Sequence, residues 1–183
     1  MTNGPDLLGL YLDEAAALPL LTRDDEARLG HAVQAGQTAR QELAKGGRRV
    51  SSTRKLQLRQ AAAAGDEAAS LFVRSNLRLV ISIARKYQWS GLPLLDLAQE
   101  GNLGLMHAVE RFDYRKGFKF STFATWWVRQ SIGRAVENTG RTVRIPAHVG
   151  DRIRQAQRVK AELEDKYRRA PSLPELAAVA ATP

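Results

Sequence analysis

The sequence predicts an all-α protein. Almost every periodic segment of its 183 residues repeats apolar side chains at helical spacing, and no segment alternates as a strand does. No Asn-Gly or Asp-Gly pair lies between two strand-like runs, so hairpins are not indicated either. We expect a multi-helix core domain over residues 1–140 and a linker helix with the start of a second small helical domain over residues 141–183.

Two helices are expected near the N-terminus. Residues 6–18 form a short amphipathic helix that ends before Pro19. Thr22 then has the position of an N-cap, with Asp25 three residues further on. The helix that this pair opens should run to about Lys45, because two glycines follow.

The following segment carries weaker signals. Residues 48–60 are strongly basic and are expected to form a loop followed by a helix. Gly65-Asp66 has the composition of a break and a new N-cap. The helix that begins there should continue to Tyr87, because apolar residues such as Val73 and Val80 keep helical spacing throughout.

The next helix is expected over residues 94–112. It contains Gly101 and Gly104, each of which costs up to ~1 kcal/mol relative to alanine. Glycines kept inside a helix at this cost indicate that a neighbouring helix approaches closely at these positions.

A turn at Lys116-Gly117 precedes the helix richest in aromatic residues. Ser121 or Thr122 is its expected N-cap, and Gly140 is its expected stop. Val128, Ile132 and Ala135 share one face of this helix and should belong to the core.

The C-terminal part should hold two helices. The first covers about residues 148–169, and Ser172 and Glu175 form a capping box that opens the second. That last helix has only a few residues before Pro183, so we expect the chain to be a piece of a longer protein.

Composition favours a polyanionic partner. Lys plus Arg total 28 and Asp plus Glu total 19, a formal net charge of +9, which favours nucleic acid as the partner. The absence of cysteine excludes disulfides and thiolate metal sites. No signal peptide, membrane span, Walker loop, HExxH motif or Gly-x-Ser-x-Gly motif is present. We therefore expect a cytoplasmic protein that is not an enzyme and needs no cofactor or metal.

The segment 111–134 carries the strongest functional signal. It holds seven of the twelve aromatic residues of the chain, interleaved with six arginines and lysines. Aromatic rings stack on unpaired bases, and cations follow the phosphates. Adjacent Trp126 and Trp127 point about 100° apart on a helix, so they are either one core and one half-buried residue or a platform that ends a base stack. Gln130 beside them has the geometry to read an adenine edge.

Two other groups stand out. Asp96, Gln99 and Glu100 share a helix face in an otherwise basic chain, which is either a solvated face or a docking surface for a basic partner helix. Arg141 and Arg144, next to a helix N-terminus, suit phosphate contacts.

Three segments together closely resemble a known family. They are NLRLVISIARKY (76–87), DLAQEGNLGLMHAVERFDYRKGFKFSTFATWWVRQSI (96–132) and RTVRIPAHV (141–149), and they resemble bacterial RNA polymerase sigma factors of the primary type. LYLDEAAALPLLTRDDEARL (10–29) is similar to the N-terminal helices of that family, whereas residues 36–69 are the least recognisable part.

The resemblance implies a helical module that docks on RNA polymerase core, recognises the promoter minus-ten element and drives its melting. The implied polymerase-binding residues, on the clamp coiled coil, are Asp96, Gln99, Glu100, Asn102 and Met106. The expected DNA-binding residues are Tyr11, Leu12, Asn76, Leu79, Phe112, Asp113, Lys116, Phe118, Ser121, Thr122, Phe123, Trp126, Trp127, Gln130, Arg134, Arg141, Arg144, His148 and Asp151.

The resemblance also implies separate tasks for the DNA-binding residues. Trp126 and Trp127 cap the upstream duplex at the edge of the bubble. A flipped adenine is surrounded by residues that match Phe112, Asp113, Lys116, Phe118, Phe123 and Gln130. A second flipped base, the downstream thymine, is matched by Asn76, Leu79 and Ser121. Tyr11 and Leu12 match the segment at the discriminator strand, and Arg144, His148 and Asp151 match positions facing the extended minus-ten duplex.

Some positions depart from the family pattern. Phe123 stands where a tyrosine is usual, and Gly133 replaces a usual threonine. Asp113 and Asp151 stand where a glutamate is common. These departures indicate a non-essential, primary-like paralogue, and we expect the piece to lack the C-terminal promoter-binding domain.

Two alternatives remain open. One is a duplex-binding helix-turn-helix regulator that uses Gln130 and Arg134 in the major groove. The other is a regulator that binds the polymerase clamp without melting DNA. An anti-sigma factor or an activator is a further partner class, and the sequence identifies neither it nor the promoters served.

Overall fold

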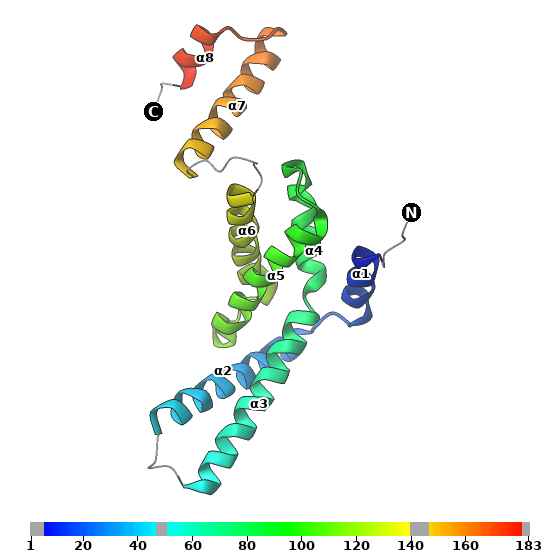
Figure 1. The fold of residues 1–183 in the computed structure, drawn as a ribbon, viewed down its shortest axis with the longest axis vertical. Coiled ribbons are helices and arrows are strands. Elements are labelled where there is room, and N and C mark those ends of the chain that lie inside the picture. Colours follow the sequence, from blue (N-terminus) through cyan, green and yellow to red (C-terminus); the bar gives the residue numbers. More distant parts are fainter. Residues whose placement is uncertain (1–5, 47–50, 140–146, 181–183) are drawn as a thin grey trace. The chain divides into compact units, whose positions relative to one another are not determined.

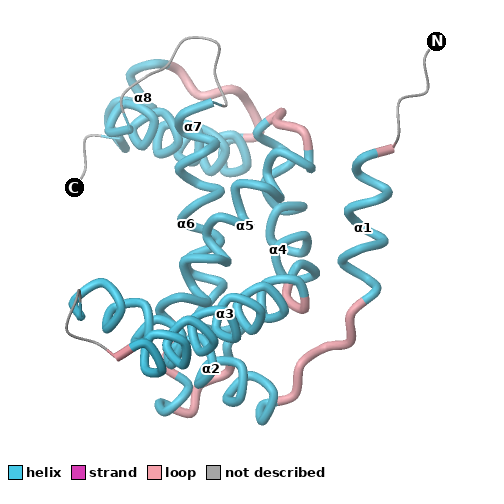
Figure 2. The backbone as a smooth tube through the Cα atoms, turned by 60° about the horizontal axis from the view of Figure 1, so that its bottom comes forward, coloured by secondary structure: helices cyan, strands magenta, loops and turns pink. Residues whose placement is uncertain are grey.

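The computed structural model describes residues 6–46, 51–139 and 147–180. Within these ranges the chain forms eight α-helices and two 3₁₀ segments, with no strand, so the all-α prediction is confirmed (Figures 1 and 2). The chain divides into two compact units, Met1–Val136 and Glu137–Pro183, and each is described by itself.

The first two helices begin where the sequence predicts. α1 covers Leu7–Ala17, and the Asp6 carboxylate accepts the Gly9 amide at 3.0 Å. α2 covers Arg23–Gly46; the Thr22 amide donates to Asp25 at 3.1 Å, and the Asp25 amide donates to the Thr22 hydroxyl at 3.2 Å. This reciprocal pair is the predicted capping box.

α3 covers Ser52–Arg74 and runs back alongside α2 (Figure 1). The predicted break at Gly65-Asp66 is wrong, because the helix continues through both residues. Gly65 lies against Gly36 of α2, where a Cβ on either residue would come within 2.7 Å of the other's Cα. The glycine therefore serves a close helix crossing.

The helix expected over 66–87 is interrupted. α3 ends at Arg74, and α4 covers Leu77–Ala84, followed by a 3₁₀ segment over Arg85–Ser90. At the break the Asn76 side-chain amide donates to the Phe72 carbonyl at 2.9 Å. A direction change here lets α3 pack on α2 while α4 packs on α5, which one straight helix would not combine.

α5 (Leu94–Arg111) approaches α6 (Phe120–Thr139) most closely at Gly104, and α4 at Gly101. A Cβ on Gly104 would lie 2.5 Å from the Trp127 carbonyl oxygen, and one on Gly101 would lie 2.6 Å from Val80. The predicted close approach at both glycines is confirmed. The predicted N-caps Ser121 and Thr122 are wrong, since the helix begins at Phe120 and both residues lie inside its first turn.

The core of the first unit lies among α3, α4, α5 and α6. Its largest side chains with almost no exposed surface are Phe72, Val80, Leu97, Leu105, Phe120, Val128 and Ile132. Val128, Ile132 and Ala135 are all buried, as the sequence predicts.

The second unit contains α7 (Ala147–Tyr167) and α8 (Leu173–Ala180). The predicted capping box is present: Glu175 accepts the Ser172 amide at 2.7 Å and its hydroxyl at 2.8 Å. Arg169 adds two bonds to the same carboxylate, at 2.7 and 3.1 Å. Among the described residues, no helix is long and apolar enough to cross a membrane.

Candidate nucleic-acid and polymerase-binding surfaces

The aromatic block divides into a core part and a surface part. Phe112, at 4 % exposure, and Phe120, at 0 %, pack with Phe72, and the ring centroids of Phe72 and Phe120 lie 4.3 Å apart. Half-buried Phe123 lies between the buried rings and the surface. Its ring centroid is 6.0 Å from that of Phe112 and 6.3 Å from that of Trp127. Phe112 therefore supports Phe123 from behind and offers almost no surface of its own.

The two adjacent tryptophans form one surface. Their rings are perpendicular, with centroids 4.9 Å apart. Trp126 is 59 % exposed, whereas Trp127 is half-buried under the Arg111 guanidinium, which lies 4.7 Å from the ring centroid. Trp127 packs against the core cluster, whereas Trp126 stands on the surface. The pair presents an apolar edge made of two perpendicular rings, with a cation beside it.

The polar candidates of α6 continue this surface. Gln130 and Arg134 are exposed and follow Trp126 at successive helical turns. Gly133, the residue before Arg134, has nothing within 4 Å of where a Cβ would lie. Packing therefore does not require glycine there, and its effect is to remove a side chain from this surface.

The loop between α5 and α6 carries the other base-contact candidates. A 3₁₀ turn covers Tyr114–Lys116, and Gly117 closes it with φ of 70°. The Asp113 carboxylate accepts the Arg115 amide at 3.2 Å, which orders the start of the turn. Phe118 is 67 % exposed, and Lys116 is exposed as well. The loop thus presents the Phe118 ring outward among three exposed cations, Arg115, Lys116 and Lys119.

The group expected around a second base lies at the α3–α4 junction. Asn76, Leu79 and Ser121 are half-buried, and Thr122 is exposed. Phe72, one turn before Asn76, packs on Phe120, the neighbour of Ser121. This packing places the two chain segments next to each other.

Tyr11 of α1 connects two predicted surfaces. Its hydroxyl donates to the Asn102 side-chain carbonyl at 3.0 Å, and the Asn102 amide donates to Gln99 at 3.3 Å. Burial raises the pKa of Tyr11, so the hydroxyl stays protonated and available as a donor. Leu12 is half-buried and lines a space of about 240 Å³ with Arg78 of α4 and Arg85 of the following 3₁₀ segment.

The predicted polymerase-binding residues lie along α5. Asp96, Gln99 and Met106 are exposed, while Glu100 and Asn102 are half-buried. Sequence reasoning missed Leu103, which is 51 % exposed and shares their stripe. The spacing 96, 99, 103, 106 was the signal that could have identified it.

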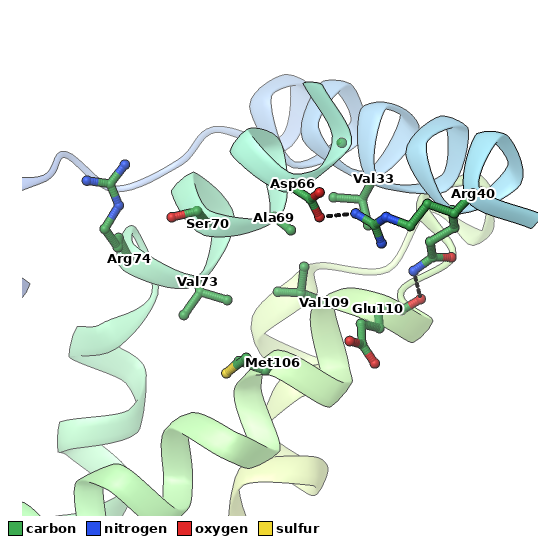
Figure 3. Close-up of a pocket in the computed structure, with 12 residues that line it drawn as sticks. Val33, Arg40, Asp66, Ala69, Ser70, Val73, Arg74, Met106, Val109 and Glu110 are labelled. Atoms are coloured by element: carbon green, nitrogen blue, oxygen red, sulfur yellow. Dashed lines mark hydrogen bonds and ion pairs between the residues drawn. The ribbon is translucent and has the colours of Figure 1, made fainter. Parts of the chain in front are cut away.

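A cavity of about 570 Å³ opens among α2, α3 and α5 (Figure 3). Val33, Val73, Met106 and Val109 supply apolar walls, and a rim of charged residues surrounds them. No sequence pattern predicts this cavity, because its walls come from three separate helices. The rim includes the Arg40–Asp66 ion pair.

Four predicted DNA contacts are not described. Arg141 and Arg144 lie outside the described residues, as do the side chains of His148 and Asp151 of α7. Within the described part of the chain, no group of three or more His, Cys, Asp or Glu residues could hold a metal ion.

Comparison with known proteins yields two family matches. Residues 72–142 match the family model for Sigma-70 region 2, and residues 6–39 match the one for Sigma-70 factor, region 1.2. The RNA polymerase principal sigma factor HrdD of Streptomyces viridifaciens is 49 % identical over 174 residues, which cover 94 % of this chain and 52 % of that protein. The principal sigma factor HrdC of Streptomyces coelicolor is 48 % identical over 177 residues, covering 95 % of this chain and 52 % of that protein. The chain thus spans about half the length of these curated relatives.

Proposed function

Because the chain belongs to the sigma-70 family, we propose that it docks on bacterial RNA polymerase core, recognises the promoter minus-ten element and drives promoter melting. It would carry out no chemistry of its own and would act in the cytoplasm, on the nucleoid, through the polymerase. The observation that carries the proposal is the aromatic surface of α6, where Trp126 and Trp127 stand beside exposed Gln130 and Arg134.

Melting follows from selective capture of one strand. Each base stacked on an aromatic ring contributes about 1–3 kcal/mol. Unpairing a base costs a few kcal/mol, so several captured bases together offset the opening of a short bubble. Trp126 and Trp127 would end the upstream duplex, while Phe118, Lys116 and Phe123 would receive a flipped base.

Polymerase docking would use the α5 stripe. Asp96, Gln99 and Glu100 give it an acidic end, and exposed Leu103 and Met106 give it an apolar centre. This arrangement suits a partner helix with basic and apolar residues on one face. An acidic surface is unfavourable against DNA, which supports a protein as its partner.

The departures at Phe123 and Gly133 support a primary-like paralogue. Phe123 retains a ring for stacking and lacks a hydroxyl. Nothing lies within 4 Å of a Cβ on Gly133, so a larger residue would fit there and packing does not account for the glycine.

Oligonucleotide binding tests the proposal. The chain is assembled with core polymerase and offered the single-stranded minus-ten sequence or its duplex. The proposal expects tighter binding of the single strand. A helix-turn-helix regulator would bind the duplex more tightly than the single strand. A clamp-binding regulator would bind core polymerase without raising its affinity for either oligonucleotide.

A further inference from the structure

Side chains on one face of α2 form hydrogen bonds to the connection between α5 and α6. Arg23, Glu26, Gly30, Gln34 and Gln37 share this face at helical spacing. The four polar members each bond a backbone group that lies 73 to 94 positions away in the sequence. The bonded backbone groups lie between the end of α5 and the start of α6.

At the start of α6, α2 supplies the cap that the local sequence lacks. The Glu26 carboxylate accepts the Phe120 amide at 3.0 Å. This amide is one of the N–H groups that a helix leaves without an internal partner, and a negative charge is favoured at that end of the helix dipole. Arg23 donates to the Gly117 carbonyl, three residues before Phe120.

At the end of α5, two glutamines act in the same way. Gln37 donates its side-chain amide to the Glu110 carbonyl at 2.9 Å, and Gln34 donates to the Phe112 carbonyl at 3.1 Å. Gly30, on the same face, lies against Tyr114, where a Cβ would come within 3.2 Å of the Tyr114 Cβ. Both ends of the loop are therefore attached to α2.

The loop held in this way carries the outward-facing Lys116 and Phe118. Its own bonds are short-range, such as the 3.4 Å bond from the Gly117 amide to the Tyr114 carbonyl. Phe118 is 67 % exposed, so little packing orients its ring. The point from which the ring projects is set by the loop backbone, and α2 holds that backbone at both ends.

We propose that Glu26 and Arg23 are positioning residues for base capture. They hold the loop 113–119 and the first turn of α6 in the geometry that receives a flipped base, and they touch no DNA. The inference rests on the proposed function. It assigns this role to two individual side chains of α2, through their bonds to the Phe120 amide and the Gly117 carbonyl.

The test compares two single-stranded probes on the chain assembled with core polymerase. One is the minus-ten oligonucleotide, and the other carries an abasic site in place of the captured adenine. The ratio of the two affinities measures base capture alone. A fraction of unfolded protein lowers both affinities equally and leaves the ratio unchanged, so a loss of stability alone does not move this readout.

Three variants are measured. Glu26→Ala should lower affinity for the intact probe about tenfold, within the range for loss of a helix cap, and leave affinity for the abasic probe unchanged. Glu26→Gln keeps an acceptor oxygen and should retain most of the ratio. Glu42→Ala, which removes a carboxylate of the same helix that pairs with Arg54, should behave as wild type.

The outcomes separate the two claims. If the wild-type ratio is large and Glu26→Ala keeps it, the positioning inference is wrong while the proposed function stands. An equal loss for both probes also overturns it, because the role would then be structural. If the wild-type protein itself does not distinguish the probes, base capture is wrong, and the inference is overturned with it.

Discussion

Gly36 and Gly65 meet at the crossing of α2 and α3, where a Cβ on either one would lie 2.7 Å from the Cα of the other. No side chain separates the two helices at this point. α2 and α3 form a helical hairpin. Its α2 side chains bond to the α5–α6 loop, and its α3 packs on α5. The crossing therefore affects both the bonds of α2 to the α5–α6 loop and the packing of α3 on α5.

Gly65→Ala should destabilise the first unit. The added methyl meets backbone atoms that no rotamer change can move, and overpacking of this kind costs about 1–3 kcal/mol. Urea unfolding followed by circular dichroism measures the change. Gly133→Ala is the matched control, because its Cβ meets nothing, and it should stabilise α6 by up to ~1 kcal/mol. Equal stability of the two variants would contradict the steric explanation.

Replacement of Trp126 and Trp127 by alanine should abolish open-complex formation and leave core binding intact. Two stacking surfaces are lost, each worth about 1–3 kcal/mol, so melting should fall by at least about thirtyfold. Permanganate footprinting of promoter thymines measures it, and unchanged thymine reactivity would refute the claim. Trp89→Ala, which removes a 70 % exposed ring outside α6, is the control and should melt normally.

The double variant Asp96→Arg and Gln99→Arg should weaken association with core polymerase by about tenfold or more, because it reverses the charge of the α5 stripe. Fluorescence anisotropy of the labelled chain measures the dissociation constant. Gln57→Arg with Glu67→Arg makes the same net charge change on the exposed side of α3 and serves as the control. Equal effects of both pairs would indicate general electrostatics in place of a specific surface.

Acid should loosen α8. Bonds from Arg169 first, then from Ser172, lower the pKa of Glu175 from 4.5 to about 2. Because the folded-state pKa lies below the unfolded one, this stabilisation is present above about pH 4.5 and is lost as the pH falls towards 2. NMR titration of the Glu175 carboxyl and of the α8 amides measures it. Glu175→Gln should remove the pH dependence, and an unshifted carboxyl titration would contradict the prediction.

Local chemistry explains which parts of the fold could be predicted. The Thr22–Asp25 and Ser172–Glu175 caps join residues three apart, so the sequence alone shows both partners. The buried face Val128–Ile132–Ala135 follows from helical spacing. The use of Gly101 and Gly104 could be anticipated because glycine inside a helix is costly without a neighbour.

The misjudged elements have partners far away in the chain. Gly65 resembles a stop signal until Gly36 is placed against it. Asn76 interrupts an unbroken apolar pattern because α3 packs mainly along α2, whereas α4 packs mainly on α5. The burial of Phe112 likewise depends on Phe72 of α3, which no local pattern places against it.

The sequence by itself therefore determined the helical class, the local caps, the aromatic and basic block and the resemblance to primary sigma factors. Each of these depends on residue type and short spacing. Only the tertiary structure decided which aromatic rings reach the surface and which side chains hold the loop that presents them. The physical reason is that the burial of a ring depends on helices distant in the sequence. The bonds from Glu26, Gln34 and Gln37 to the ends of α5 and α6 likewise span 73 to 94 positions, and no local pattern records them.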